Sequence, residues 1–368
     1  MSRTVAGAVL AFGLALAGVP AGTFAAPPLG LPPVPIPADN PQSPEKISLG
    51  KRLFEDKRFS GDGTVSCSNC HDPAKAFADG LPVAEGIRKQ HGARNSPTVI
   101  NAAYYESQFW DGRRPSLEAQ SKDPFLNPVE HGLTSHEPIL ATIRGDKDYP
   151  GQFRHAFGVE PAALTIDHVA KAIAAFERTV IAGDSPFDRY LYGGERGAIP
   201  ASAIRGLDIF RTKGRCQDCH SIGQTTALFT DNKFHNIGAG FSRIAGRYLQ
   251  VASAFRKARQ QGKEVDKSVI TDRDASELGR FVVTLRPSDL GRFKTSSLRN
   301  IAVTGPYMHD GSMKTMEEVV EFYNKGGEQN PFLDSGIRPL NLTAEEKADL
   351  VAFLKTLTSP QYANLAQP

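Results

Sequence analysis

The residues whose types and spacing most directly suggest chemistry are the cysteines. The chain has 4 cysteines among 368 residues, and all of them fall in two copies of one motif, Cys-x-x-Cys-His. The first copy is Cys67, Cys70 and His71, and the second is Cys216, Cys219 and His220. In this motif two thioethers can fix the edge of a porphyrin while the imidazole of the next residue reaches its iron. The sequence therefore predicts two covalently attached c-type haems.

Three other kinds of site use paired cysteines: a disulfide framework, a zinc site and a thioredoxin-like redox pair. Disulfides suit an exported protein, but they do not need a histidine directly after each cysteine pair. A zinc site would need paired ligands at similar spacings, yet 145 residues separate Cys70 from Cys216 and no third pair exists. Haem attachment explains the histidines as well as the cysteines.

Two haems alone would make an electron carrier. Catalysis would also require an iron whose sixth position is open or can open, and side chains that move protons there.

The elements around the two motifs repeat. A short amphipathic helix pattern, Gly50–Phe54, precedes the first motif, and a similar one, Gly206–Phe210, precedes the second. The two motifs begin 149 residues apart. We therefore expect two similar modules in tandem, residues 46–190 and 200–360, with their boundary near residues 184–200.

The remaining signals favour a mainly α-helical protein of two cytochrome c-like domains packed around a shared interface. An apolar stripe at helical spacing runs from Ile166 to Val180. A capping box at Thr343–Glu346 precedes an apolar segment. No sustained alternating pattern indicates a large sheet. Residues 79–101 and 288–312 form long Gly- and Pro-containing connections, and connections of this length are often functional.

The first residues point to export. Arg3, an apolar run and a small-residue stretch ending at Ala25 or Ala26 are typical of a signal peptide, residues 1–25, which predicts a periplasmic location. The run is shorter than the ~20 apolar residues of a spanning helix, and no later segment predicts a membrane span. Residues 26–45 are Pro-rich and predict an extended linker or strap rather than a packed element. The formal net charge of +3 gives no support for a nucleic acid or an anionic membrane as partner.

Longer runs give the chain a family resemblance over roughly residues 40–360. The runs are His91–Asn101, Phe109–Arg113, Gln120 with Asn127–Glu130, Ser297–Asn300 and Thr304–Gly311. Together they resemble the bacterial di-haem cytochrome c peroxidases and their MauG-type relatives. The resemblance implies that the haem on His71 reduces hydrogen peroxide and that the haem on His220 receives electrons and passes them on.

The resemblance also implies roles for single residues. Glu130 and Gln120 match the distal pocket, where a carboxylate can move a proton between the two peroxide oxygens; the alternative for Glu130 is a surface carboxylate. Trp110, the one tryptophan, matches the residue between the haems, although a lone tryptophan is more often core packing. Asn95, Thr304 and Pro306 match three ligands of a calcium ion, one side-chain oxygen and two backbone carbonyls.

One position divides the family. Peroxidase members have a methionine ligand 14 residues after the histidine that corresponds to His309, and here that position is Tyr323. MauG-type enzymes have a ligating tyrosine there. A phenolate stabilises oxidised iron, whereas a thioether raises the potential. The alternative is that Tyr323 is a packed aromatic and that Met308, Met313 or Met316 is the ligand.

Two histidines are ambiguous. His91 matches, with an uncertain register, a removable sixth ligand of the peroxidatic iron, or it is an ordinary loop histidine. His131 stands where relatives usually carry methionine, and either tunes the distal pocket or replaces His91 as a ligand.

The sequence therefore predicts a di-haem peroxidase in which Glu130 is the acid–base group. A small c-type cytochrome or a cupredoxin would donate the electrons. The alternative is a MauG-type oxidase that modifies a protein substrate through a bis-ferryl state, and a second is a non-catalytic electron carrier. Members of the family are often dimers, so a homodimer is also compatible.

Overall fold

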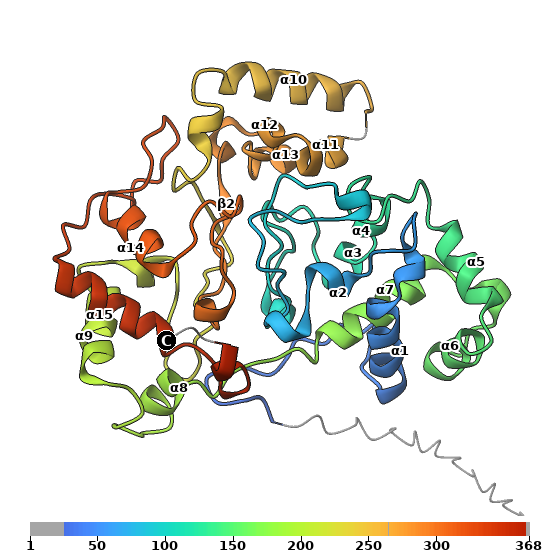
Figure 1. The fold of residues 1–368 in the computed structure, drawn as a ribbon, viewed down its shortest axis with the longest axis horizontal. Helices are drawn as coiled ribbons and strands as arrows, with labels where there is room; N and C mark the ends of the chain where they lie inside the picture. The colour runs from blue at the N-terminus through green and yellow to red at the C-terminus, as the bar shows by residue number, and fades with distance from the viewer. Residues whose placement is uncertain (1–25, 264, 366–368) are drawn as a thin grey trace, which may run out of the picture.

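The structure, a computed structural model, describes residues 26–263 and 265–365, and the predicted signal peptide lies outside them. The described chain is mainly α-helical, as predicted (Figure 1). The first half contains α1 (Pro44–Glu55), α2 (Cys67–Cys70), α3 (Leu117–Gln120), α4 (Asp123–Leu126), α5 (Glu137–Gly145), α6 (Tyr149–Phe157) and α7 (Ile166–Glu177). Helix α8 (Pro186–Leu191) follows and packs with the second half, where Phe187 belongs to the apolar cluster. The second half contains α9 (Ala201–Arg211), α10 (Tyr248–Gln260), α11 (Val265–Thr271), α12 (Arg273–Ser276), α13 (Phe281–Thr284), α14 (Met316–Asn324) and α15 (Ala344–Lys355). Two short antiparallel strands, β1 (Phe234–His235) and β2 (Phe293–Lys294), form the sheet of the described chain.

Helices α1 and α7 form the frame of the first half. The side chain of Ser43 caps α1 by accepting a hydrogen bond from the backbone N–H of Lys46, and α1 then buries Leu49 and Leu53. The two helices approach so closely at Gly50 that a Cβ there would lie 1.9 Å from the carbonyl oxygen of Ala172. The glycine is therefore required by the helix crossing.

Helices α9 and α15 form the same frame in the second half. A Cβ on Gly206 would lie 2.0 Å from the carbonyl oxygen of Asp349. The predicted capping box begins α15, because the Thr343 side chain accepts from Glu346 N and the Glu346 side chain accepts from Thr343 N. Each motif is therefore preceded by a helix that crosses a later helix at a glycine.

A third unit was not predicted from the sequence. Helices α10–α13 enclose a separate apolar cluster that includes Phe241, Leu278 and Phe281. Figure 1 shows these helices gathered at one end of the molecule, above both halves. The unit contacts the first half where the Arg94 guanidinium donates to Ser276 Oγ and to the Ser276 carbonyl.

The Pro-rich segment is extended, as expected, but it is packed against the protein, contrary to the prediction. Leu31 and Asn40 are buried. The Gly30 carbonyl accepts from the Arg299 guanidinium, and the Pro32 carbonyl accepts from the Tyr104 hydroxyl. Prolines hold this segment extended. Its backbone carbonyls, such as those of Gly30 and Pro32, accept hydrogen bonds from both halves.

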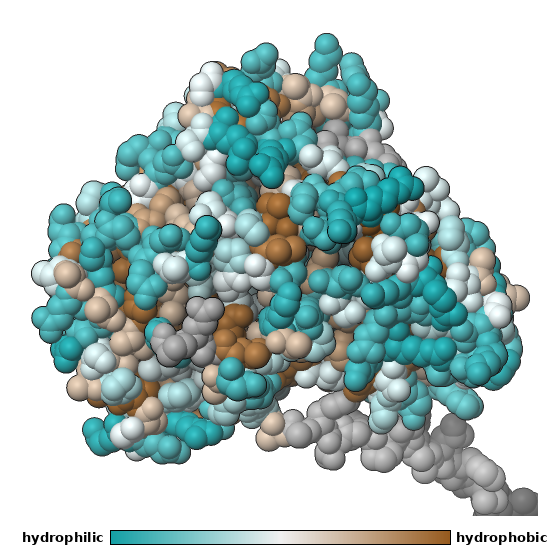
Figure 2. Space-filling model, viewed as in Figure 1, coloured by the Kyte–Doolittle hydropathy of each residue, from teal (hydrophilic) through white to brown (hydrophobic). Residues whose placement is uncertain are grey.

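The surface drawn in Figure 2 is mostly hydrophilic over both halves, with small groups of hydrophobic residues near the middle. Among the described residues, no helix has the length and apolar character needed to cross a membrane.

Candidate functional site

The first motif lies on one helical turn. Ser66 begins α2, where it and Asn69 form a capping box. Cys67 and Cys70 are free thiols on this turn, and burial raises the pKa of both, that of Cys70 to about 12. Burial also lowers the pKa of His71, which favours the neutral imidazole that binds metals. Two unpaired thiols beside a neutral, buried imidazole fit a c-type haem.

The second motif has the same parts and a clearer histidine geometry. Cys216 begins a 3-10 turn, Cys216–Asp218, and both of its cysteines are free thiols. Nδ1 of His220 lies 2.9 Å from the carbonyl oxygen of Phe229. A proton on Nδ1 donated to this carbonyl leaves the lone pair of Nε2 for an iron. The residues of the second motif therefore also fit a haem.

Glu130, which the family resemblance assigns to the distal pocket, lies close enough to the first motif to act on its thiols. Its charge raises the pKa of both Cys67 and Cys70. Its own pKa is raised to about 7 by burial, which outweighs the opposing charge of Arg113 and the hydrogen bond from Asn127. That bond, from Asn127 Nδ2 to Glu130 Oε1, is 2.6 Å long. A carboxyl group with a pKa near neutrality is suited to take up and release protons.

Arg113 is a site residue that the sequence did not single out. Its guanidinium packs 3.4 Å from the centre of the Phe109 ring and binds Asp111 at 3.2 Å. Its side chain is only 6% exposed, and among the described residues Nε has no hydrogen-bond partner. Gln120, the last residue of α3, is half-buried. The feature that marks Arg113 as a site residue is its charge, which acts on Glu130. This proximity depends on the fold, so a sequence pattern does not show it.

Tyr323 lies on α14 close to the second motif. Burial raises its pKa, and the thiols of Cys216 and Cys219 raise it further. Met316, one of the alternative ligands, is instead buried in the apolar cluster of the second half. Cys216 also packs against this cluster, so the feature that marks Tyr323 is the action of both cysteines on its hydroxyl group.

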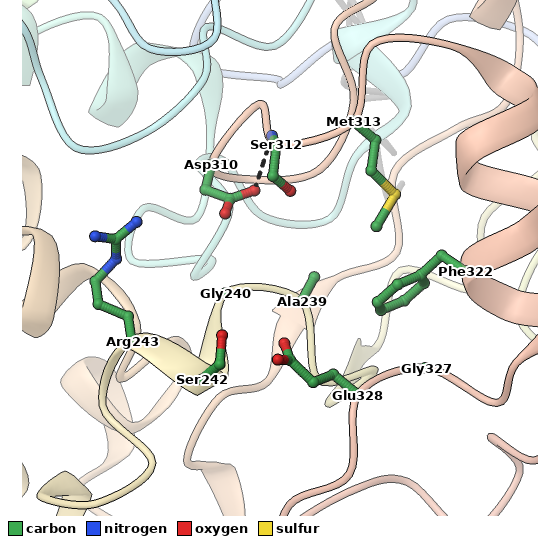
Figure 3. A pocket seen from close by; sticks show the side chains of 10 residues that line it. All are labelled: Ala239, Gly240, Ser242, Arg243, Asp310, Ser312, Met313, Phe322, Gly327 and Glu328. Atoms are coloured by element: carbon green, nitrogen blue, oxygen red, sulfur yellow. Dashed lines mark hydrogen bonds between the residues drawn. The ribbon is translucent and has the colours of Figure 1, made fainter.

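A cavity of about 620 Å³ opens beside α14 (Figure 3). Phe322 and Met313 border it on one side, and Arg243, Asp310 and Glu328 supply charged groups. Arg243 also lies 3.4 Å from the carboxylate of Glu277, which is buried behind the cavity. None of the predicted ligands lines this cavity except Met313.

Trp110 lies where the two halves meet. Its indole Nε1 donates to the carbonyl of Asn95, and its own carbonyl accepts from Lys294 N at 2.8 Å. In return, Asn95 N donates to the carbonyl of His309 at 2.7 Å. Asn95 and Trp110 are 15 residues apart, as are Lys294 and His309. The two halves thus exchange equivalent backbone hydrogen bonds, and a ring from each half faces the other.

The predicted calcium ligands lie on two segments that meet at the same junction, through the bond from Asn95 N to the His309 carbonyl. Asn95 is buried, and its side-chain Nδ2 donates to the Leu81 carbonyl, so its Oδ1 is the oxygen left for a cation. Thr304 and Pro306 precede His309, to which Asn95 is bonded. The donor set is all oxygen, as a hard cation requires.

The two ambiguous histidines differ in position. The His91 side chain is 56% exposed and lies 3.8 Å from the Glu85 carboxylate, so the structure does not place it in the buried site. His131 is buried, with Nδ1 3.0 Å from the Phe59 carbonyl and its ring against Phe125. Burial lowers the pKa of His131 to about 4, so it is neutral.

Two further acidic or basic groups near the motifs were missed, one buried and one half-buried. Glu177, at the end of α7, has its pKa raised to about 8 by burial, and its charge acts on Cys67. His235 lies between Asp231 and Asp334, at 2.9 and 2.8 Å. Cys219, Asp231 and His235 are close enough to hold a metal, but the haem motif already accounts for Cys219.

Comparison with known proteins agrees with this geometry. The profile of the family described as di-haem cytochrome c peroxidase matches residues 44–196. The chain is 39% identical over 347 residues to the cytochrome-c peroxidase IdrP1 of Denitromonas iodatirespirans, covering 93% of this chain and 89% of that protein. It is 39% identical over 324 residues to the methylamine utilization protein MauG of Methylorubrum extorquens, covering 88% and 81%. A solved structure, a MauG-like protein associated with microbial copper homeostasis, is similar with a TM-score of 0.74 and 34% identity, over 93% of this chain and 96% of that one.

Proposed function

Because the chain belongs to the di-haem cytochrome c peroxidase family, we propose that it reduces hydrogen peroxide at the haem held by Cys67, Cys70 and His71. Electrons would arrive through the haem held by the second motif. The observation that carries this proposal is Glu130, a half-buried carboxyl group beside the first motif whose pKa is raised to about 7. Near the second motif the ionisable group that the cysteines act on is instead the phenol of Tyr323.

When bound, the first haem supplies an iron that coordinates and reduces peroxide, and the second supplies an iron that exchanges single electrons. Glu130 takes the proton from one peroxide oxygen and returns it to the other, which leaves as water. Because the bond from Asn127 occupies Oε1, we assign Oε2 to the proton transfer. Glu130 must be a carboxylate before it can accept this proton.

The neighbouring groups position peroxide and favour the charged form of Glu130. The positive charge of Arg113 lowers the pKa of Glu130, against the effect of burial. We assign Arg113 and Gln120 to holding peroxide and the departing oxygen by donated hydrogen bonds. Trp110, which is bonded to both halves, lies on the proposed route of single electrons.

The position of Tyr323 favours a second candidate. An anionic oxygen ligand would stabilise the oxidised forms of the second haem. Such a protein could store both oxidising equivalents of peroxide and use them on a residue of a protein substrate, as MauG-type relatives are expected to do. The two candidates share the chemistry at Glu130 and differ in what supplies the electrons.

The location and the other partners follow from the same assignment. Haem attachment and the signal-like residues 1–25 support the periplasm. We propose a small c-type cytochrome or a cupredoxin as the electron donor of the peroxidase, and a calcium ion held by Asn95, Thr304 and Pro306 at the junction of the halves.

The test is peroxide turnover by the holoprotein with Glu130→Gln. The amide keeps the bond to Asn127 but cannot take up a proton, so turnover should fall by on the order of 10²–10⁴. Glu160→Gln, at an exposed carboxylate paired with Arg154, is the matched control and should leave turnover unchanged. Equal rates for the wild type and Glu130→Gln would exclude this role.

A further inference from the structure

We propose that His309 and Glu277 form a positioning pair that holds Trp110 and compensates the positive charge that forms when its indole loses an electron. The inference rests on the proposed function in one respect, that Trp110 passes single electrons between the two haem sites. It concerns two residues that the proton chemistry at Glu130 does not use.

The His309 ring contacts two other rings. It packs against Trp110, with ring centres 6.4 Å apart and planes at 70°. It also stacks on Phe293, at 3.7 Å and 15°. His309 is buried, and its backbone carbonyl is held by Asn95 N. The imidazole therefore has a defined orientation toward Trp110.

The carboxylate of Glu277 contacts the His309 ring. Its Oε2 lies 2.8 Å from Nε2 of His309, and the two side chains are 2% and 3% exposed. Gly240 makes room for the carboxylate, because a Cβ there would be only 2.3 Å from Oε2. The outer oxygen, Oε1, lies 3.4 Å from Nε of Arg243, which borders the cavity in Figure 3.

The hydrogen bond of the indole explains why compensation is needed. Nε1 of Trp110 donates to the peptide carbonyl of Asn95, and a peptide carbonyl is too weak a base to remove the proton. When one electron leaves Trp110 for the oxidised first haem, the proton stays on Nε1 and no bond breaks. The ring is then positively charged until an electron from the second haem site restores it.

Glu277 is suited to offset that charge. Asp111, the next residue to Trp110, is paired with two buried guanidiniums, those of Arg94 and Arg113, whereas Glu277 has one arginine partner, Arg243, whose side chain is 39% exposed. Glu277 reaches Trp110 from the other half through the His309 ring. A carboxylate at roughly 10 Å, in surroundings with an effective dielectric constant of about 20, changes an equilibrium by about tenfold.

The test uses the diferric holoprotein without peroxide. A photogenerated one-electron oxidant removes an electron from the protein, and rapid-freeze EPR measures the yield and lifetime of the tryptophan radical. The chain has a single tryptophan, so Trp110→Phe must abolish this signal. In Glu277→Gln the hydrogen bond to His309 can persist without the charge, and we expect the radical yield or lifetime to fall about tenfold.

Asp349→Asn is the matched control, because Asp349 is also a buried carboxylate paired with an arginine, Arg205, but in the α9–α15 frame. It should lose stability without changing the radical. The inference is wrong if the wild type gives no tryptophan radical, if Glu277→Gln equals the wild type, or if Asp349→Asn has the same effect. A Trp110 radical that depends on Glu277, in a protein that does not react with peroxide, would uphold this inference and reject the proposed function.

Discussion

The loops around Trp110 and around His309 have the same backbone and different chemistry. Each has a residue with positive φ before the ring, Phe109 at 68° and Met308 at 72°, and each ends in a glycine with positive φ. One ring is an indole bonded to a neutral peptide carbonyl, and the other is an imidazole bonded to a carboxylate. The repeat preserves the scaffold, so the two sites differ through their side chains.

The same contrast holds at the two motifs. The first has a carboxyl group, Glu130, whose pKa is raised to about 7, and the second has a phenol, Tyr323, whose pKa is raised by burial and by the cysteines. A group that exchanges protons near neutrality serves chemistry on peroxide, whereas a phenolate serves to hold an oxidised iron. The predictions below test whether the two sites divide the work in this way.

The largest effect should come from removing one haem attachment at a time. Cys67→Ser with Cys70→Ser should abolish the reaction with peroxide. Cys216→Ser with Cys219→Ser should leave a single reaction with peroxide but stop repeated turnover with an electron donor. Stopped-flow absorption of each variant, with circular dichroism to verify folding, is the measurement; the reverse pattern would exchange the roles of the two sites.

The next effect is the pH dependence of turnover. Since Glu130 acts as a carboxylate and its pKa is raised from its ordinary value to about 7, turnover should be constant above pH 7 and fall as the pH falls through 7, by roughly tenfold for each pH unit below it. The residual turnover of Glu130→Gln should lack this change near pH 7. An identical profile in both proteins would mean that another group titrates.

Tyr323→Met tests the second site alone. Replacing an anionic oxygen ligand by a thioether should raise the reduction potential of the second haem, by on the order of hundreds of millivolts. Spectroelectrochemical titration measures both haems in one experiment. Tyr307→Phe, which removes a hydroxyl bonded to the Ile301 carbonyl, is the control and should leave the potential unchanged. If Tyr323→Met also leaves the reduction potential of the second haem unchanged, Tyr323 is not a ligand.

The smallest effect, and one that should be alike in both halves, concerns the crossing glycines. Gly50→Ala and Gly206→Ala each place a Cβ about 2 Å from a backbone carbonyl oxygen, which should lower the free energy of unfolding by about 3 kcal/mol. Denaturant titration measures this. Ala substitution at Gly145, where a Cβ would have no neighbour within 4 Å, should lower the free energy of unfolding far less. An equally large decrease at Gly145 would show that the cost of replacing glycine comes from the backbone conformation and not from the helix crossing.

Sequence patterns were sufficient for features encoded locally. The two motifs, the cap at Thr343 and the apolar faces of α7 and α15 depend on residues a few positions apart, and the structure contains them. The α10–α13 unit was missed because its apolar residues pack on one another across a segment without a motif. The packing of the Pro-rich segment was missed because it depends on distant partners such as Tyr104 and Arg299.

The site shows the same limit. Glu130, Trp110 and Tyr323 were predicted as site residues because they match positions in family motifs, and their roles stay predictions. Arg113, Glu177 and Glu277 were not assigned roles, because only the fold shows that they are buried and which charges they face. The exposed position of His91 was likewise visible only in the structure, and its role as a ligand stays a prediction.

The most direct test of the division between the two sites is to mix the diferric holoprotein with hydrogen peroxide and record optical and near-infrared absorption within milliseconds. If Tyr323 is the ligand that we propose for the second iron, we predict an immediate reaction and a near-infrared band from charge shared between the two haems, both lost in Glu130→Gln. A protein that reacts only after reduction by one electron, and shows no such band, would contradict the role of Tyr323.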